Sequence, residues 1–373
     1  MHTLVLHFSG EFKLLMKNIF FTVGPSKIYP RVDVYAREAF EQEIPSLSHR
    51  SAEFQDLYKT AIDALRRLLK IPDTHRIFFL TSGTEGMERV VQNCVGTTSF
   101  HFIDGAFSKK FLNTSLAYRK NTLSRAVHSL KDFEAPLPKE AEVVCFTHNE
   151  TSTGMVVPPE VLYRIKKENP RALVAVDTVS SMPHADFDYS LLDCVFFSVQ
   201  KGFGLPAGLG VLVVSPQAFQ KHEALLAGGF SIGYHHSFPE LEKYGTDHQT
   251  HETPNVLDIY LFGKVLADME RLGIDSVREG INRRAERLYE YFGAHPERFR
   301  LVQTEPALRS PTTIVTEVIG GSVALVAGLK KKHIVVGAGY GADKEKHIRI
   351  ANFPAHTDED IARLIAALSA SLS

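Results

Sequence analysis

The chain has 373 residues, 44% of them hydrophobic, and it carries 42 lysines and arginines against 43 aspartates and glutamates. A chain of this length can bury a large core, divided over two domains. Because the charges balance, no general field attracts nucleic acid or an anionic membrane, and we expect a small polar or anionic ligand held by local charges. No apolar run of the sequence approaches the roughly 18 residues that span a bilayer, so neither nucleic acid nor a membrane is an expected partner.

The three cysteines, Cys94, Cys145 and Cys194, are far apart in the sequence and lie in apolar or mixed runs. This pattern argues against a disulfide framework or a zinc site and predicts reduced, buried thiols in a cytoplasmic protein without a metal. The first residues are apolar but lack the basic start and the small-residue cleavage site of a secretory signal. Because Met16 heads a more ordinary beginning, residues 1–15 are predicted to be an extension outside the functional fold.

The first segment with candidate binding residues precedes a predicted amphipathic helix. His49 and Arg50 come just before a run in which Leu57, Leu65 and Leu68 share one helical face. At the amino end of that helix the two residues fit either of two interpretations. They are a solvated pair, or the arginine binds an anionic substrate.

A predicted strand at residues 76–81 is followed by Ser82, Gly83, Thr84 and Glu85 and then by a helix. A turn of this kind places backbone N–H groups and hydroxyls together at the positive end of the helix dipole, as in a phosphate site. The segment is neither a Walker A loop nor a dinucleotide-binding GxGxxG loop. A simple helix cap explains it equally well.

Further strands are predicted along the chain as far as about residue 215. They lie at residues 100–103, 142–147, 173–177, 196–199 and 208–214. The repeated order of strand, loop and helix predicts a mostly parallel sheet with helices on both faces. Phe107 follows the first of these strands, where its ring either packs in the core or stacks on a flat ligand.

Two of these strands end near opposite charges. The strand at 173–177 ends in Asp177, and the strand at 196–199 is followed by Gln200 and Lys201. Open α/β sheets bind ligands at the carboxyl edge, so we expect this amine and this carboxylate to face one crevice. Taken singly, each residue also fits a structural role, the lysine in a solvated loop and the aspartate as a turn cap.

The last part of the chain is predicted to form a second domain. Residues 235–251 are rich in His, Tyr and charge and are predicted to form a long loop. A long helix then starts near Thr253, and strands near 310–318 and 347–350 precede a last helix at 358–368. The predicted organisation is a large domain over residues 16–255 and a smaller α+β domain over residues 256–373.

Together these segments resemble a known family. Asp177, Lys201, the turn at 82–84 and Arg349 on a strand near the end resemble the fold type I enzymes that use pyridoxal 5′-phosphate, and most closely the class V aminotransferases. The segments that look like phosphoserine aminotransferase are 48–50 with 53–54, 105–110, 149–151, 200–201 and 253–254. The resemblance implies an α/β fold with a mostly parallel seven-stranded sheet, pyridoxal 5′-phosphate as cofactor, and a homodimer with a shared active site.

The resemblance also implies roles for the residues around the cofactor. Lys201 matches the lysine that binds the cofactor covalently and moves the substrate proton, and Asp177 matches the partner of the pyridine nitrogen. Phe107 takes the place of the stacking ring, and Thr151 that of the hydrogen bond to the 3′ oxygen. The residues that match the phosphate site are Ser82, Gly83, Thr84, Glu85, Gln200 and, from a second subunit, Thr253.

For the substrate, the resemblance assigns Arg349 to the α-carboxylate and His49 with Arg50 to the distal anion. The sequence departs from the phosphoserine pattern at two places. Glu252 stands where the family has an asparagine before the threonine, and a carboxylate near a phosphate is unfavourable. Residues 336–340 are glycine-rich where the phosphoserine enzymes carry a second His-Arg pair, and this is closer to the alanine–glyoxylate and serine–pyruvate enzymes.

The expected reaction is therefore the transfer of an amino group between an amino acid, first O-phospho-L-serine, and a 2-oxo acid, as in serine biosynthesis. The alternative on the same fold is a transaminase for alanine or serine with glyoxylate or pyruvate. A lyase of the cysteine desulfurase kind needs a reactive cysteine in the second domain, and none follows Cys194. A non-enzymatic phosphate-binding module has no need for Lys201 opposite Asp177.

Overall fold

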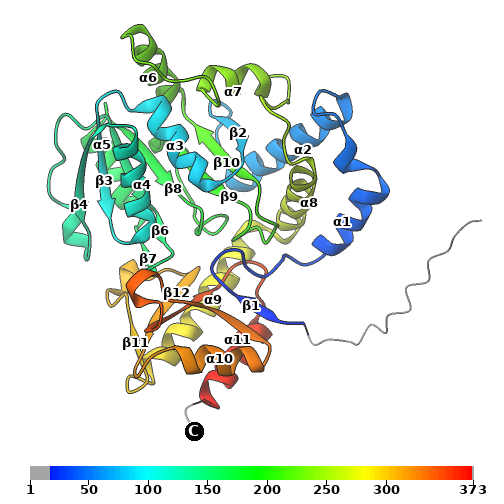
Figure 1. Cartoon of the computed structure of the whole chain (residues 1–373), viewed down its shortest axis with the longest axis vertical. Coiled ribbons are helices and arrows are strands. Elements are labelled where there is room, and N and C mark those ends of the chain that lie inside the picture. Colours follow the sequence, from blue (N-terminus) through cyan, green and yellow to red (C-terminus); the bar gives the residue numbers. More distant parts are fainter. Residues whose placement is uncertain (1–16, 372–373) are drawn as a thin grey trace, which may run out of the picture.

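The computed structural model describes residues 17–371, so the predicted extension at 1–15 lies outside the described residues. Two sheets organise the chain, the larger in the upper part of Figure 1 and the smaller below it. None of the helices between residues 17 and 371 is both long enough and apolar enough to cross a membrane.

The larger sheet has seven strands. The strand β10 is antiparallel to both of its neighbours, and the other adjacent pairs are parallel. The predicted mostly parallel seven-stranded sheet is therefore confirmed. In spatial order the strands are β2 (Arg76–Leu80), β10 (Gly210–Val214), β9 (Cys194–Ser198), β8 (Leu173–Asp177), β5 (Val143–Thr147), β3 (Thr98–Ile103) and β4 (Asn121–Ala126).

Helices cover both faces of this sheet because its central strands are apolar on both sides. Phe197 points to one face and Phe196 to the other, and each side chain is fully buried. The helices on the Phe197 side are α1 (Val32–Glu41), α2 (Ala52–Leu69), α5 (Pro159–Glu168) and α8 (Val256–Leu272). Those on the Phe196 side are α3 (Gly83–Cys94), α4 (Ala106–Ala117), α6 (Pro216–Ala227) and α7 (Phe238–Gly245).

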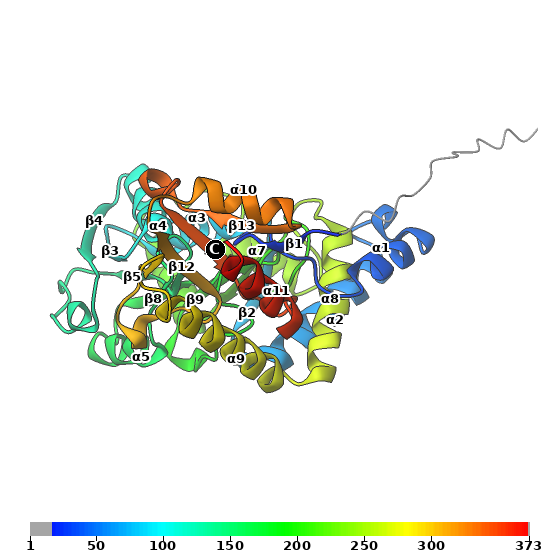
Figure 2. The same ribbon diagram turned by 90° about the horizontal axis from the view of Figure 1, so that it is seen from below.

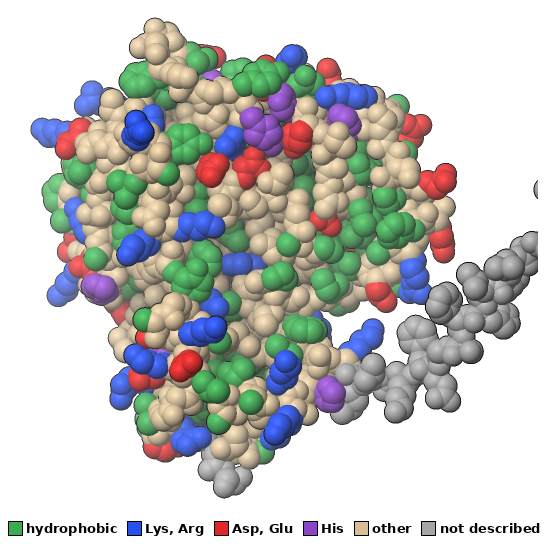
Figure 3. Space-filling view, in the orientation of Figure 1, with side chains coloured by type: hydrophobic (Ala, Val, Ile, Leu, Met, Phe, Trp, Pro, Cys, Tyr) green, Lys and Arg blue, Asp and Glu red, His purple; other side chains and the backbone are tan. Residues whose placement is uncertain are grey.

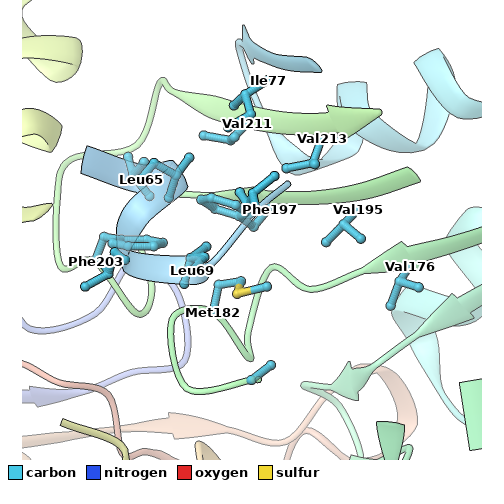
Figure 4. Close-up of a cluster of buried hydrophobic side chains, with 14 of the residues drawn as sticks. Leu65, Leu69, Ile77, Val176, Met182, Val195, Phe197, Phe203, Val211 and Val213 are labelled. Carbon is cyan, nitrogen blue, oxygen red and sulfur yellow. The ribbon is translucent and has the colours of Figure 1, made fainter. Parts of the chain in front are cut away.

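Figure 4 shows the core on the first of these faces, where Leu65 and Leu69 of α2 lie with Phe197, Val211 and other strand residues. Burial of an aromatic side chain such as that of Phe197 contributes about 1.5–3 kcal/mol to stability. This core fixes α2 and the strand ends relative to each other. It therefore fixes the sheet edge at which the polar residues gather.

The smaller sheet has five strands, and β1 pairs with β13 in parallel while the other pairs are antiparallel. Its strands are β1 (Ile19–Phe21), β13 (Ile334–Ala338), β14 (His347–Ala351), β12 (Thr313–Val318) and β11 (Phe299–Leu301). Figure 2 shows α9 (Ile274–Gly293), α10 (Val323–Lys331) and α11 (Asp358–Ser369) grouped around it.

The two ends of the described chain meet at this smaller sheet. The strand β1 belongs to it although the other four strands follow residue 298, and Lys27 pairs with Asp360 of α11 at 2.5 Å. The helix α8 packs instead against α2, in the core of the larger sheet. The division into domains at residues 255 and 256 stays a prediction.

Short elements connect these layers. The strands β6 (Asn149–Glu150) and β7 (Met155–Val156) form a two-stranded ladder. The 3-10 helices are η1 (Ile44–Ser46), η2 (Leu130–Phe133), η3 (Tyr189–Leu191), η4 (Pro306–Leu308) and η5 (Gly341–Asp343).

The prediction of one long loop over residues 235–251 is wrong, because α7 occupies its middle. A proline stands in the first turn of α7, where its missing N–H costs nothing, and Phe238 and Leu241 bury one face of the helix. The sequence-based prediction weighted the high content of His and Tyr and overlooked the helical spacing of Phe238 and Leu241.

The cysteines are free and buried, as the sequence predicts. Although Cys94 and Cys194 are 100 positions apart, their sulfur atoms lie 3.9 Å from each other. Each belongs to the core that α3 forms with the sheet.

Candidate active site

A cavity of about 270 Å³ lies at the carboxyl edge of the larger sheet, where β14 and the segment after β13 close its other side. Figure 3 shows lysine and arginine side chains in the middle of this face, between the parts that hold the two sheets. The predicted residues that line the cavity are Ser82, Gly83, Thr84, Phe107, Thr151, Asp177, Gln200, Lys201 and Arg349.

Lys201 lies in the turn after β9, and its side chain is buried in the cavity wall. Its Nζ donates a hydrogen bond of 3.0 Å to Oγ1 of Thr151 and lies 5.2 Å from the centre of the Phe107 ring. Burial lowers the pKa of Lys201 to about 8, although the negative charge of Asp177 acts in the other direction. A substantial fraction of this amine is thus neutral near pH 8, which makes it a usable nucleophile.

A glycine makes room for this lysine. The φ angle of Gly24 is +135°, and a Cβ atom there would lie 2.7 Å from Cε of Lys201. Only glycine adopts this backbone conformation without strain and leaves the space for the lysine chain. The Gly-Pro turn near the start of the chain therefore forms part of the site, as the lining by Val23 and Gly24 also indicates.

A chain of hydroxyl groups holds Thr151 in place. Its Oγ1 donates to Oγ of Ser180 at 3.0 Å, and Ser180 in turn donates to the backbone oxygen of Asn149 at 2.7 Å. In this arrangement the proton of the Thr151 hydroxyl is directed at Ser180. This order makes the Thr151 oxygen an acceptor for Lys201.

Asp177 is the last residue of β8, and only 4% of its surface is exposed. Its Oδ1 accepts a hydrogen bond of 2.9 Å from the backbone N–H of Val179. Burial raises the pKa of Asp177 to about 6, against the effects of this N–H and of the Lys201 charge. A cationic N–H partner stabilises the ionised form of such a buried carboxylate, because the partner replaces the lost solvation.

The turn before α3 has the geometry of an anion site. Ser82 caps the helix, and its Oγ accepts from the N–H of Glu85 at 3.1 Å. Gly83 and Thr84 line the cavity at the amino end of a helix of 12 residues. Lys110 of α4 adds a positive charge there, because its Nζ donates to Oγ1 of Thr84 at 2.7 Å.

Phe107 lies in the first turn of α4, and Glu150 fixes that turn. The buried carboxylate of Glu150 accepts from the backbone N–H groups of Phe107 and Ser108, each at 2.9 Å. Charge-assisted bonds of this kind at a helix start are stabilising. Glu150 therefore holds the Phe107 ring at the cavity without lining the cavity itself.

The segment after β13 brings Tyr340 to the site. Its ring centre lies 5.5 Å from that of Phe107 and 5.5 Å from the guanidinium carbon of Arg349. Arg349, on β14, donates from Nε to the backbone oxygen of Ala338 at 2.7 Å. Where the sequence lacks a second His-Arg pair, the structure thus places the aromatic ring of Tyr340.

Four predicted residues lie outside the lining of this cavity. Arg50 donates from Nη1 to Oε1 of Gln249 and to the backbone oxygen of Thr250, both at 2.8 Å. His49 and Arg50 directly precede α2. The contacts of Arg50 place this pair beside the segment that leads to Thr253, whose side chain is exposed. Glu85, the fourth, directs its carboxylate to Thr81, at 2.8 Å from the backbone N–H.

Several buried polar atoms of the cavity wall have no hydrogen-bond partner within residues 17–371. They are Oγ1 of Thr147, Oδ1 of Asn149 and Oγ of Ser198. Buried polar atoms are rarely left in this state, so these atoms indicate a polar ligand that completes their hydrogen bonds. The donor set fits a small ring that carries oxygen and nitrogen substituents and a phosphate.

Sequence reasoning missed Asn149, Ser180 and Tyr340, which line the cavity, and Glu150, which supports it. The signal for Asn149 and Glu150 was present, because they stand next to Thr151 at the end of a predicted strand. For Tyr340 there was no local signal. Its place depends on how the smaller sheet meets the larger one.

The fold is that of the fold type I enzymes that use pyridoxal 5′-phosphate, and comparison with known proteins specifies the family. The model of the family described as "Aminotransferase class-V" matches residues 109–364. A phosphoserine aminotransferase from Cytophaga hutchinsonii has a solved structure that is 39% identical, with a TM-score of 0.93, over 95% of this chain and 99% of its own.

Two more distant relatives extend the comparison. The putative phosphoserine aminotransferase of Mycobacterium leprae is 27% identical over 357 residues, with 92% of each chain covered. The alanine–glyoxylate aminotransferase structure from Nostoc sp. is 22% identical, with a TM-score of 0.82, over 98% of this chain and 97% of its own, which shows the shared fold.

The chain belongs to the class V aminotransferases. It is an enzyme, a transaminase that depends on pyridoxal 5′-phosphate and acts on an amino acid and a 2-oxo acid. The cavity fits this cofactor, because its wall offers unpaired polar atoms, a helix start for a phosphate, and an amine opposite a carboxylate.

Proposed function

We propose that this transaminase moves the amino group between O-phospho-L-serine and 2-oxoglutarate, as in serine biosynthesis. The observation that carries the proposal is the 39% identity to the Cytophaga hutchinsonii phosphoserine aminotransferase over nearly the whole chain. The alanine–glyoxylate enzyme shares the fold at only 22% identity. Because the fold serves several amino acids, the substrate has to be argued from the site.

At the centre of the site, Lys201 and Asp177 have different roles. When bound, the cofactor accepts the electrons of the substrate's carbon–hydrogen bond. Lys201 would hold the cofactor through its Nζ, and the same amine would accept the α-proton of the substrate. The Asp177 carboxylate would pair with the ring nitrogen of the cofactor and would keep that nitrogen protonated. Support comes from the burial of both groups in one cavity.

Phe107 and Thr151 orient the cofactor ring in this proposal. The ring of Phe107 is held in place because backbone N–H groups at the start of α4 donate hydrogen bonds to Glu150, so it offers a fixed stacking surface. Thr151 places its hydroxyl beside Lys201, and when this hydroxyl turns away from Ser180 it can donate to the 3′ oxygen of the cofactor. A ring fixed on one face in this way keeps the bond that breaks aligned with the amine of Lys201.

The cofactor phosphate is assigned to the start of α3. Ser82, Gly83 and Thr84 present hydroxyl and N–H groups there, and Gln200 also lines the cavity. The Glu85 N–H already donates to Ser82, so Glu85 acts by fixing the serine oxygen. Thr253 completes the phosphate site from a second subunit.

Arg349 is assigned to the α-carboxylate of the substrate, because a half-buried guanidinium in the cavity wall binds a carboxylate through two parallel hydrogen bonds. His49 and Arg50 are assigned to the distal phosphate. They lie outside the cavity of their own chain, beside the segment that carries Thr253. This placement supports a homodimer in which these three residues serve the partner's cavity. We further infer a cytoplasmic enzyme, which the free cysteines support.

The second candidate is an alanine or serine transaminase, and Tyr340 favours it. If the distal phosphate of phosphoserine lay beside the Tyr340 ring, it would lack the cation that a second His-Arg pair would provide. In the proposed reaction, Arg50 of the second subunit supplies that positive charge. The two candidates therefore differ in whether the distal group of the donor carries charge.

A half-reaction screen tests the substrate. Cofactor-loaded enzyme is mixed with phosphoserine, glutamate, alanine or serine in turn, and the loss of absorbance from the bound aldehyde form is followed. We expect phosphoserine and glutamate to convert the cofactor rapidly and alanine and serine to do so far more slowly. If alanine or serine converts it and phosphoserine does not, the substrate assignment is wrong.

The rate of cofactor loading should depend on pH. Only a neutral amine adds to an aldehyde, and the pKa of Lys201 is lowered to about 8. We expect the loading rate of the apoenzyme to rise with pH with a midpoint near 8 and then to level off, as measured by the appearance of the yellow chromophore. A midpoint near 10.5, the ordinary lysine value, would contradict this assignment.

A further inference from the structure

A buried histidine lies between two carboxylates next to the proposed phosphate site. The side chain of His236 is fully buried, its Nδ1 is hydrogen-bonded to Oε1 of Glu85, and its Nε2 lies 2.5 Å from Oε2 of Glu252. Figure 3 shows histidine side chains gathered beside acidic ones in the region below α7. We call these three residues the Glu-His-Glu bridge.

The bridge joins two segments that the proposed function uses. Glu85 lies in the first turn of α3, directly after Thr84 of the cavity wall. Its other oxygen accepts from the N–H and the hydroxyl of Thr81, at 2.8 and 2.7 Å. Glu252 directly precedes Thr253. His236 therefore ties the start of α3 to the segment that carries Thr253.

The charge of this histidine is set by its two partners. With a carboxylate at each ring nitrogen, both nitrogens act as donors, and the ring is an imidazolium. Burial by itself lowers the pKa of His236, but the hydrogen bonds to Glu252 and Glu85 raise it to about 9. Without this cation, two half-buried carboxylates would face each other beside a site for a phosphate dianion. Their repulsion would oppose phosphate binding.

Glu85, His235 and His236 also form a group that could hold a metal ion, because one ligand atom of each lies within 4.8 Å of the others. The rings of His235 and His236 stack with their centres 3.9 Å apart and their planes at 21°. Two ligand atoms on one zinc ion lie about 3.3 Å apart, given zinc–ligand distances of about 2.0–2.1 Å. The nitrogens of His236 lie closer than this to the carboxylate oxygens, which is the distance of a hydrogen bond.

We propose that His236 is a positioning residue for the cofactor, because its ring neutralises Glu85 and Glu252 and holds the start of α3 against the Thr253 segment. This inference rests on the proposed assignment of the cofactor phosphate to α3. It also explains how the chain tolerates Glu252 where related enzymes have an asparagine. The histidine balances the extra carboxylate.

The test compares neighbouring histidines in apoenzyme that is titrated with pyridoxal 5′-phosphate. Binding is measured by equilibrium dialysis and absorbance, because the chain has no tryptophan to report it. We expect His236→Gln to raise the dissociation constant at least about tenfold, the direction expected when one partner of a buried charge pair is removed. The matched control is His235→Gln, whose side chain is 57% exposed and which should change the constant less than about twofold.

A double variant separates charge balance from a purely structural role. Because His236→Gln leaves Glu252 unbalanced, the variant with both His236→Gln and Glu252→Gln should bind the cofactor more tightly than His236→Gln alone. If the single variant does not give a cooperative thermal transition, the double variant should still fold and bind. A double variant that binds no better, or that also fails to fold, overturns the inference.

The remaining outcomes are equally decisive. Unchanged cofactor affinity in His236→Gln overturns the positioning role while the proposed function stands. Failure of the wild-type protein to take up cofactor contradicts the proposed function itself. Stoichiometric zinc in wild-type protein that is lost in His236→Gln would assign the cluster to a metal and overturn the bridge.

Discussion

Replacing Lys201 by alanine should abolish transamination and the covalent attachment of the cofactor. Its amine is buried in the cavity, 3.0 Å from Thr151, and no other lysine lines that wall among residues 17–371. Loss of a general base alone costs about 10²–10⁴ in rate, and the nucleophile is lost with it. We expect kcat to fall at least about 10³-fold. After borohydride reduction, the intact mass should show cofactor on the wild type and none on the variant.

The matched control for this experiment is Lys109→Ala. Lys109 is an exposed residue of α4, so its loss should leave both the rate and the labelled mass unchanged. Lys201→Arg provides a second comparison, because it keeps a positive charge but cannot add to an aldehyde at neutral pH. Covalent cofactor on either Lys201 variant, or turnover at the wild-type rate, would show that the chemistry belongs to another residue.

The second large effect is expected for Asp177→Asn. A neutral amide cannot hold the cofactor's ring nitrogen in its protonated form, and loss of one partner from a buried charge pair costs about 3–5 kcal/mol. We expect kcat to fall about 10²–10³-fold with little change in substrate KM. Asp177→Glu keeps the charge in a position that is only 4% exposed and should retain more activity than the asparagine variant. Steady-state kinetics on loaded enzyme measures both.

The stability of the apoprotein separates this role from a role in folding. The pKa of Asp177 is raised from 3.8 to about 6, so the stability it contributes is present below pH 3.8 and is lost as the pH rises through 6. At pH 8 the buried carboxylate is ionised and unfavourable. Apo Asp177→Asn should therefore melt at or above the wild-type temperature. A large fall in melting temperature at that pH would mean that the aspartate serves folding first.

The larger sheet could be predicted because its signal is local. Continuous apolar runs, such as those ending in Asp177 and at Ser198, predict strands that are buried on both faces. The structure confirms that both segments are buried strands. The same rule placed Lys201 and Asp177 at one edge, since parallel strands end on the same side of a sheet. Family resemblance, and not spacing, supplied the roles of Thr151 and Arg349.

The sequence by itself determined the α/β class and the residues at the strand ends, because each is recorded within a short window of the chain, and it determined the class V aminotransferase family through several such segments in order. Only the tertiary structure decided the rest. It paired β1 with β13, brought Tyr340 to Phe107, and placed His236 between Glu85 and Glu252, which are 151 and 16 positions away. These contacts arise from the packing of whole layers. A local pattern of hydrophobicity or charge does not encode which distant segment a layer will meet.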